Sequence, residues 1–536
     1  MNSETNNTDG WHPFPYEERL LEVNKTLNYG EWTMDKGIGL YHRTKEIHAC
    51  RIPIVPVALY RNADTGQEKI KLIFFKFNRW HEIMVEREVI ANKNKIISLA
   101  NYGIEVTTEN ARHLVKALND IIANSLATIP RFSSKSCLGW HGGQFVPYSD
   151  EFAFDGTDNY RDIFNAVSQC GTLEEWCGYM KKLRENRYFR MMLAASFASP
   201  LVELLGQNSF ILHLWGLTGI GKTVALMAAM SVWGDPEPGR MVRTLNMTQN
   251  AMLQTAAFLK NLPFAADELQ TIKRNGIDYT QLIMQLTEGV NRSRMKYDQL
   301  SPLGSWRSSF IFTAEEPILK QGSGGGAKNR VVQVECRGKI VENGNETANF
   351  VRSHYGCAGR KFIESLDRAR AKEIYDDVYS SLVGSFDVTD KQAGSAALLI
   401  AADWLSSELF WPDDSEVLQI DRIAGFLSSA DEVDPAEQAY QLTLDLITEH
   451  NRNFTPDAID CWGLISGNRA YFINSVLTRE LEKLGFDLNA VKSEWAKRGY
   501  LIKYKENYRY PKRISDAILS CTCLELRDVT DCYTRL

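Results

Sequence analysis

An apolar strand that runs into a glycine-rich loop and then a helix constrains this chain more than any other segment. Residues 210–215 are Phe-Ile-Leu-His-Leu-Trp, residues 216–223 are Gly-Leu-Thr-Gly-Ile-Gly-Lys-Thr, and an Ala- and Met-rich run follows over 224–230. Glycines let backbone N–H groups turn inward around a phosphate, Lys222 neutralises its charge, and the helix presents its positive N-terminal end. The pattern predicts a parallel α/β core that binds a nucleotide.

The loop and a second strand together predict the chemistry of ATP with Mg²⁺. We expect the phosphates to be held by the whole loop: Gly216, Leu217, Thr218, Gly219, Ile220, Gly221, Lys222 and Thr223. The hydroxyl of Thr223 also suits Mg²⁺. Residues 261–268 form an apolar run that ends in Asp267 and Glu268. Asp267 would hold the metal through water and Glu268 would polarise the attacking water. The alternative is an Asp-Glu pair that starts a helix.

Two further residues complete the predicted catalytic set. Residues 308–315 form a third apolar strand, and Thr313 near its end would orient water at the γ-phosphate. A glycine-rich loop at 322–326 precedes Arg330, which suits an arginine finger that stabilises charge on the transferring phosphoryl group. Alternatively, Thr313 is only the polar end of a buried strand. Arg330 is alternatively a surface arginine at the start of a strand.

Alternating basic residues between the second and third strands predict a nucleic-acid contact. In a strand or hairpin, Arg292, Arg294 and Lys296 fall on one face, where a phosphate backbone can pass. A solvated hairpin is the alternative.

Length and composition bound the class of protein. A chain of 536 residues is too long for a single hydrophobic core, so we expect two to four domains. Its composition, with 44% hydrophobic and 24% charged residues, is ordinary for a soluble globular protein. The net charge of -6 argues against a uniformly basic nucleic-acid binder. We expect no signal peptide and no transmembrane helix, and the scattered cysteines predict reduced thiols in a cytoplasmic protein rather than a zinc site.

The pattern of strands and helices predicts four ranges. These are a small α/β N-terminal domain at 1–135, a helical linker region at 136–205, the ATPase domain at 206–385, and a helical, winged-helix-like C-terminal domain at 386–536. In the last, residues 491–513 carry eight basic and two acidic side chains interleaved with five aromatics. Such a segment suits nucleic acid; a small packing domain with a charged rim is the alternative.

These motifs, together with Leu-Gly-Trp at 138–140 and His-Tyr-Gly-Cys-Ala-Gly at 354–359, resemble the family designated domain of unknown function 927. Its better-understood relatives resemble the helicases of staphylococcal cassette elements, AAA+ ATPases similar to MCM replicative helicases. The resemblance implies a multidomain α/β fold with a P-loop AAA+ core. In it the basic segment with Arg292, Arg294 and Lys296 becomes a hairpin that grips DNA. Arg352 and Arg360 are candidates for a second sensor arginine.

The predicted function is an ATP-dependent, ring-forming DNA helicase that replicates a phage, plasmid or integrated mobile element. Its predicted partners are single-stranded or forked DNA, further copies of itself in a homo-oligomer, expected to be a hexamer, and a primase or replication-initiation protein. A nucleotide-gated loader, switch or defence ATPase without unwinding activity is the alternative from another class.

Overall fold

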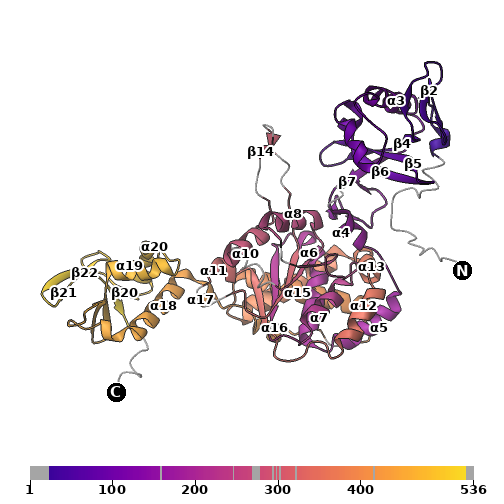
Figure 1. The fold of residues 1–536 in the computed structure, drawn as a ribbon. Helices are drawn as coiled ribbons and strands as arrows, with labels where there is room; N and C mark the ends of the chain where they lie inside the picture. Colours follow the sequence, from indigo (N-terminus) through magenta and orange to yellow (C-terminus); the bar gives the residue numbers. More distant parts are fainter. Residues whose placement is uncertain are drawn as a thin grey trace.

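The computed structural model describes residues 23–156, 160–244, 247–268, 278–291, 295–296, 299–300, 304–319, 323–414 and 417–526. The chain forms an N-terminal unit, a larger central unit and a C-terminal unit, arranged in that order across the molecule (Figure 1). Their buried apolar side chains fall mainly into three clusters, within residues 27–129, 138–423 and 436–526. Among the described helices, none has the length and apolar character needed to cross a membrane.

The N-terminal unit is a mixed α/β structure. Its five-stranded sheet has the order β10-β7-β4-β5-β6, in which β4, β5 and β6 are antiparallel neighbours and β4, β7 and β10 are parallel. The strands are β4 (Ile54–Asn62), β5 (Glu68–Lys76), β6 (Arg79–Glu86), β7 (Arg131–Lys135) and β10 (Ala153–Phe154). Helix α3 (Ala111–Asn124) buries Leu114, Leu118 and Ile121 against it, since these side chains recur every three to four residues. A small antiparallel sheet of β1 (Trp32–Asp35), β2 (Gly39–His42) and β3 (His48–Cys50) adjoins α3, with α2 (Arg87–Ala91) and η1 (Ile96–Tyr102).

A hairpin and three helices connect this unit to the central sheet. They are β8 (Gly139–His141), β9 (Gln144–Val146), α4 (Arg161–Ala166), α5 (Leu173–Leu183) and α6 (Arg187–Leu204). Helix α6 is buried over residues 188–202, because it is apolar around its whole circumference. The range 136–205, expected to be a linker, therefore contributes a central helix to the core.

A five-stranded parallel sheet organises the central unit, with strand order β12-β13-β16-β11-β17. The strands are β12 (Val242–Thr244), β13 (Phe264–Asp267), β16 (Ser309–Ala314), β11 (Phe210–Trp215) and β17 (Val331–Glu335). Near-continuous burial along β11, β13 and β16 is typical of parallel strands covered on both faces. Around them lie α7 (Lys222–Met230), α8 (Gln249–Leu259), α10 (Tyr279–Glu288), α11 (Gly325–Lys328), α12 (Gly344–Ser353) and α13 (Cys357–Ser365).

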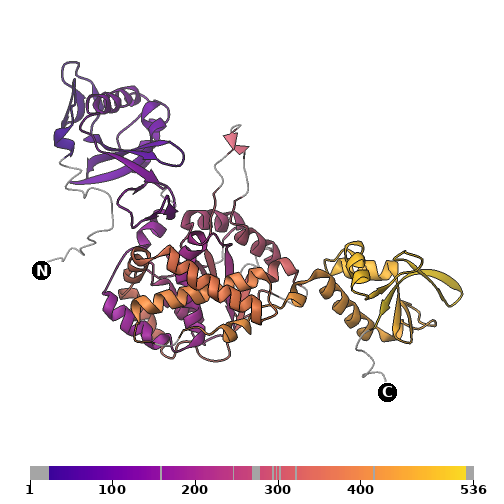
Figure 2. The same ribbon diagram turned by 180° about the vertical axis from the view of Figure 1, so that it is seen from behind.

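Long helices α14 (Arg368–Ser385) and α15 (Asp390–Phe410) cross one side of the central unit, and α16 (Ile420–Ala424) follows (Figure 2). Helix α15 is buried on almost every side because residues 396–402 are all small or aliphatic, and it packs on α6 and α14. The expected boundary at 386 therefore differs from the structure, in which residues up to 423 belong to the central core.

The C-terminal unit places three helices on one face of an antiparallel sheet. After α17 (Ala430–Val433) come α18 (Pro435–Glu449), η3 (Asn451–Asn453), β18 (Gly463–Ser466), β19 (Arg469–Ile473), α19 (Asn474–Lys483), α20 (Leu488–Lys497), β20 (Leu501–Ile502), β21 (Tyr510–Ile514) and β22 (Ala517–Glu525). In chain order the unit is thus a helix, a hairpin, two helices and three further strands, of which β20 and β21 both pair with β22.

Candidate nucleotide site and nucleic-acid interface

The 216–223 loop joins the end of β11 to the start of α7. Gly221 caps α7 at φ 91°, a left-handed conformation that favours glycine, and a Cβ there would approach Val341 to 3.1 Å. The Lys222 ammonium lies over the loop and donates to the carbonyls of Gly216 and Leu217, each at 2.7 Å. Burial lowers the pKa of Lys222, and the nearby Cys336 and Asp267 oppose that shift.

The strand order brings three predicted site residues together. Because β16 lies between β13 and β11, Thr313 stands between the loop and Asp267. The Thr223 hydroxyl donates to Asp267 Oδ2 at 2.5 Å, and the Thr313 hydroxyl donates to Asp267 Oδ1. One half-buried carboxylate thus links the start of α7 to the ends of two strands.

Glu268 follows Asp267 in a conformation that few non-glycine residues adopt. Its φ is 57°, and its backbone N–H donates to Asp267 Oδ1 at 2.9 Å. The side chain is exposed. Left-handed backbone at a non-glycine residue costs free energy and is concentrated at functional sites. The Asp267 carboxylate and the Thr223 hydroxyl bonded to it are oxygen donors of the kind that Mg²⁺ takes.

Arg330 lies at the opposite end of the sheet from the loop. Its carbonyl accepts from Ile211 N at 2.9 Å, at the start of β11, whereas the loop follows the far end of that strand. At about 3.3 Å per residue, five strand residues separate the two by about 17 Å. Arg330 Nη1 donates to Gly326 O at 2.6 Å, and the side chain lines a cavity of about 530 Å³ with Glu288, Asp376 and Asp390. Within one chain, Arg330 is therefore not brought to the loop.

The predicted basic segment is described only in part. Arg292 and Arg294 lie outside the described residues, while Lys296 belongs to β14 (Met295–Lys296), which pairs antiparallel with β15 (Gln299–Leu300). Both ribbon views show this hairpin standing out from the central unit beyond α8 (Figures 1 and 2). Residues 295–296 and 299–300 are therefore antiparallel neighbours, and the contact of Arg292, Arg294 and Lys296 with nucleic acid stays a prediction.

Asn261, at the start of the apolar run that leads into β13, is buried and holds two other segments, a role that the sequence did not predict. Its side-chain oxygen accepts from Trp140 N at 2.8 Å, and its amide donates to Arg307 O at 2.9 Å. A Cβ on Gly139 would lie 2.5 Å from the same oxygen. Asn261 thus fixes the Leu-Gly-Trp turn of residues 138–140 onto the segment that leads into β13. A polar residue directly before an apolar strand is the sequence feature that could have identified it.

The two candidate sensor arginines are both paired away from the loop. Arg352 forms an ion pair with Glu237, and Arg360 pairs with Glu364 at 2.8 Å.

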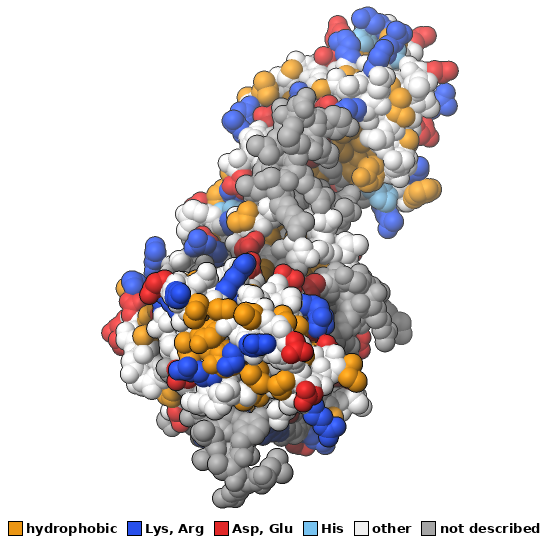
Figure 3. Space-filling view, turned by 90° about the vertical axis from the view of Figure 1, so that its left-hand side faces the viewer, with side chains coloured by type: hydrophobic (Ala, Val, Ile, Leu, Met, Phe, Trp, Pro, Cys, Tyr) orange, Lys and Arg blue, Asp and Glu red, His pale blue; other side chains and the backbone are white. Residues whose placement is uncertain are grey.

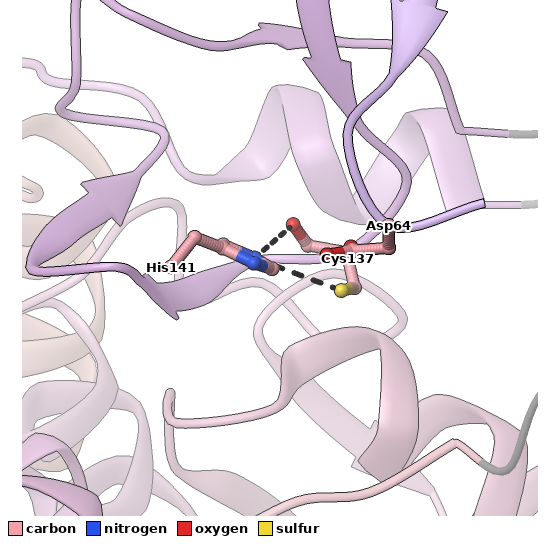
Figure 4. Close-up of side chains that lie close together, drawn as sticks. All are labelled: Asp64, Cys137 and His141. Atoms are coloured by element: carbon pink, nitrogen blue, oxygen red, sulfur yellow. Dashed lines mark hydrogen bonds between the residues drawn. The ribbon is translucent and has the colours of Figure 1, made fainter. Parts of the chain in front are cut away.

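Asp64, Cys137 and His141 form a cluster that resembles a metal site, where the β4–β5 turn meets the β8–β9 hairpin. His141 Nε2 lies 3.3 Å from Cys137 O and 3.7 Å from Cys137 Sγ (Figure 4). Lys260 lies 3.4 Å from His141 Nδ1, and Lys135 pairs with Asp64. Burial, with Lys260 and Lys135, lowers the pKa of His141 to about 4. Two ammonium groups therefore already engage two of the three ligands, so the cluster fits a neutral histidine network better than a cation site.

Comparison with known proteins agrees with this multidomain α/β architecture. The family model described as domain of unknown function (DUF927) matches residues 30–298, half of the chain, and the chain belongs to this family. A model described as the Cch helix turn helix domain matches residues 434–528. No curated protein matches the sequence.

Solved structures include one similar over nearly the whole chain. It is titled "SCCmec type IV Cch - active helicase" and aligns with a TM-score of 0.69 at 17% identity, covering 93% of this chain and 98% of that chain. This likeness shows a shared fold. A second structure, the apo A form of the NrS-1 C terminal region, aligns with a TM-score of only 0.25 at 12% identity, covering 69% of this chain and 90% of that chain.

Proposed function

We propose that this protein is an ATP-dependent DNA helicase with an AAA+ core, which assembles into a ring and replicates a phage, plasmid or integrated mobile element in the cytoplasm. The observation that carries the proposal is the hydrogen-bonded group of Thr223, Asp267 and Thr313 beside the Lys222 loop. These are the residue types that ATP hydrolysis with Mg²⁺ requires, gathered from the start of α7 and the ends of two adjacent strands.

Each residue has a separate part in the proposed reaction. Backbone N–H groups of the 216–223 loop and the Lys222 ammonium bind the phosphates. Thr223 and Asp267 would hold Mg²⁺, which neutralises charge on the β- and γ-phosphates when bound. Glu268 accepts a proton from the attacking water and Thr313 orients that water.

The strand order supports the AAA+ assignment. Strand β16 lies between β11, which precedes the 216–223 loop, and β13, which ends in Asp267. Thr313 on β16 therefore lies between the loop and Asp267, as expected for a residue that orients water at the γ-phosphate. The likeness to the SCCmec Cch structure, titled an active helicase, extends over the same core.

DNA contact is proposed at two places on the chain. The hairpin of β14 and β15 would present Arg292, Arg294 and Lys296 to single-stranded or forked DNA. The helix-turn-helix match at residues 434–528 favours a second DNA contact in the C-terminal unit. A primase or initiation protein would act on the same DNA.

Ring formation is supported by the place of Arg330. A catalytic arginine about 17 Å from its own loop can serve only a neighbouring subunit's loop, so the proposed site is shared between protomers of a hexamer.

Strand displacement tests the function directly. The full-length protein is mixed with 3′- and 5′-tailed forked duplexes carrying a fluorophore and quencher, with ATP and Mg²⁺. We expect unwinding with ATP, none with a non-hydrolysable analogue and none with Lys222→Ala. ATP hydrolysis without strand displacement on either fork would instead identify a loader, switch or defence ATPase.

A further inference from the structure

The sheet of the C-terminal unit has two apolar faces, and its helices cover one of them. Phe472 and Leu524 belong to the cluster formed with α18, α19 and α20. Tyr471, Cys521 and Cys523 point the other way, because side chains alternate along a strand. Figure 3 looks onto this end of the molecule and shows apolar side chains gathered in a patch crossed and bordered by Lys and Arg. We call the second face the outer sheet face.

Tyrosines from three neighbouring segments meet on the outer sheet face. Tyr471 and Tyr510 have ring centroids 5.3 Å apart, and Tyr510 and Tyr504 are separated by 5.2 Å. Tyr471 is only 5% exposed, whereas Tyr504 is 37% exposed and Tyr510 is half-buried. The two outer rings are therefore accessible and the inner ring supports them.

Basic side chains lie directly against these rings. Lys512 Nζ is 3.9 Å from the centre of the Tyr471 ring, and Lys505 Nζ is 5.6 Å from that of Tyr504. Over β19 and residues 501–525 the chain has six basic and three acidic side chains: Arg469, Lys503, Lys505, Arg509, Lys512 and Arg513 against Glu506, Asp516 and Glu525. Glu506 approaches Lys503 at 3.9 Å, whereas Lys505, Arg509 and Lys512 form no ion pair with a described carboxylate. The aromatic surface thus has a positive border.

Helix α20, the last helix before the final hairpin, offers much less positive charge. Lys492 is buried and donates to Asn474 Oδ1 at 2.9 Å. Glu494 pairs with Lys497 at 3.0 Å and with Arg498 at 3.4 Å. On this helix Lys492 is therefore engaged within the unit and Lys497 and Arg498 share Glu494, whereas Lys505 and Lys512 on the sheet side lie against the tyrosine rings.

We propose that the outer sheet face binds single-stranded nucleic acid, with bases stacked on Tyr504 and Tyr510 and phosphates held by Lys505 and Lys512. Exposed rings beside lysines suit a strand whose bases are unstacked, whereas a duplex keeps its bases paired inside. The inference rests on the proposed function only in taking nucleic acid as the partner, and it requires neither ATP hydrolysis nor the β14–β15 hairpin.

Binding of a labelled oligonucleotide tests the proposal. Fluorescein-labelled dT20 is titrated with full-length protein, without nucleotide, in a background of Arg292→Ala, Arg294→Ala and Lys296→Ala that removes the proposed hairpin site. Tyr504→Ala with Tyr510→Ala should weaken binding about tenfold or more, because each stacked base contributes to affinity. Tyr504→Phe with Tyr510→Phe keeps both rings and should bind within about twofold of the background.

Charge and folding controls make the result decisive. Lys505→Gln with Lys512→Gln should reduce the slope of log affinity against log salt by about 1.4, because each phosphate contact on single strands contributes about 0.7. Lys497→Gln on α20 is the matched control and should leave both affinity and slope unchanged. Tyr504→Ala alone, at an exposed position beside a turn, preserves a readout if the double variant fails to fold.

Two results would overturn the proposal. One is unchanged dT20 binding in folded Tyr504→Ala protein and in the double lysine variant, as expected if the face binds a protein partner. The other is a loss with Lys497→Gln that equals the loss with the tyrosine variants, which would move the contact to α20. Weakened dT20 binding in these variants together with absent strand displacement by the wild type would reject the helicase function and retain this surface.

Discussion

At the scale of single residues, Lys222 contacts the loop and is also proposed to bind a phosphate, so its substitution should affect ATP hydrolysis but not the fold. Lys222 holds two loop carbonyls, and its charge is directed to a phosphate in the proposed reaction. Lys222→Ala should abolish ATP hydrolysis and leave the overall fold intact, because the lost contacts are confined to the loop. Phosphate release measures ATP hydrolysis, and thermal unfolding followed by circular dichroism measures whether the fold is intact. Lys339→Ala, at an exposed lysine paired with Glu342, is the control and should hydrolyse ATP normally.

Glu268 is predicted to act on water rather than on the nucleotide. Glu268→Gln keeps the size of the side chain but cannot accept a proton, so ATP should still bind while hydrolysis falls by about two orders of magnitude or more. Equilibrium binding of a fluorescent ATP analogue and single-turnover hydrolysis separate these effects. Near wild-type hydrolysis in this variant would reassign the water-polarising role.

At the scale of elements, the β14–β15 hairpin is predicted to contact single strands. Replacing Arg292, Arg294 and Lys296 together by alanine should lower single-strand affinity and flatten its salt dependence, by about 0.7 in log–log slope for each lost phosphate contact. Basal ATP hydrolysis should persist, since the hairpin stands away from the loop. Unchanged affinity for single-stranded DNA together with unchanged unwinding would mean that this segment is a solvated hairpin without a role in DNA binding.

The C-terminal unit is a second element whose removal is informative. Its cluster of buried apolar residues begins at Ala436, so a cut within α18 would expose apolar side chains, whereas deleting residues 434–536 removes the cluster whole. The truncated protein should lose more DNA affinity than ATP hydrolysis. Insoluble protein after this cut would favour a packing role, and unchanged DNA affinity would exclude the unit from binding.

Local patterns predicted the elements of the site better than their partners in space. The glycine loop, the apolar strands and the Asp-Glu pair each follow from short-range sequence, and the observed strands β11, β13 and β16 lie where these patterns put them. The hydrogen bonds of Asp267 to Thr223 and Thr313 depend on strand order, which no local pattern specifies. For the same reason α15 could not be assigned to the central core, because its apolar residues fit any buried environment.

At the scale of the whole molecule, the proposed finger role of Arg330 predicts a site shared between chains, because Arg330 lies far from its own loop. The start of β17 and the end of β11 lie at opposite ends of the sheet, and no side chain spans about 17 Å. The acidic residues Glu288, Asp376 and Asp390 line the same cavity as Arg330, so the side chain stands among carboxylates at this end of the sheet.

A mixing experiment tests this shared site. Arginine fingers contribute about 10³ to 10⁵ in rate, so Arg330→Ala should bind ATP but be nearly inactive. Lys222→Ala is inactive for a different reason and keeps its finger. Mixed rings of the two should recover some hydrolysis, because an intact loop on one subunit can meet an intact arginine on the next. The activity of the mixture is compared with that of each parent, and co-assembly is verified by pulling down one tagged variant with the other. A co-assembled mixture no more active than its parents would mean that each loop is completed within its own chain, or by a residue other than Arg330.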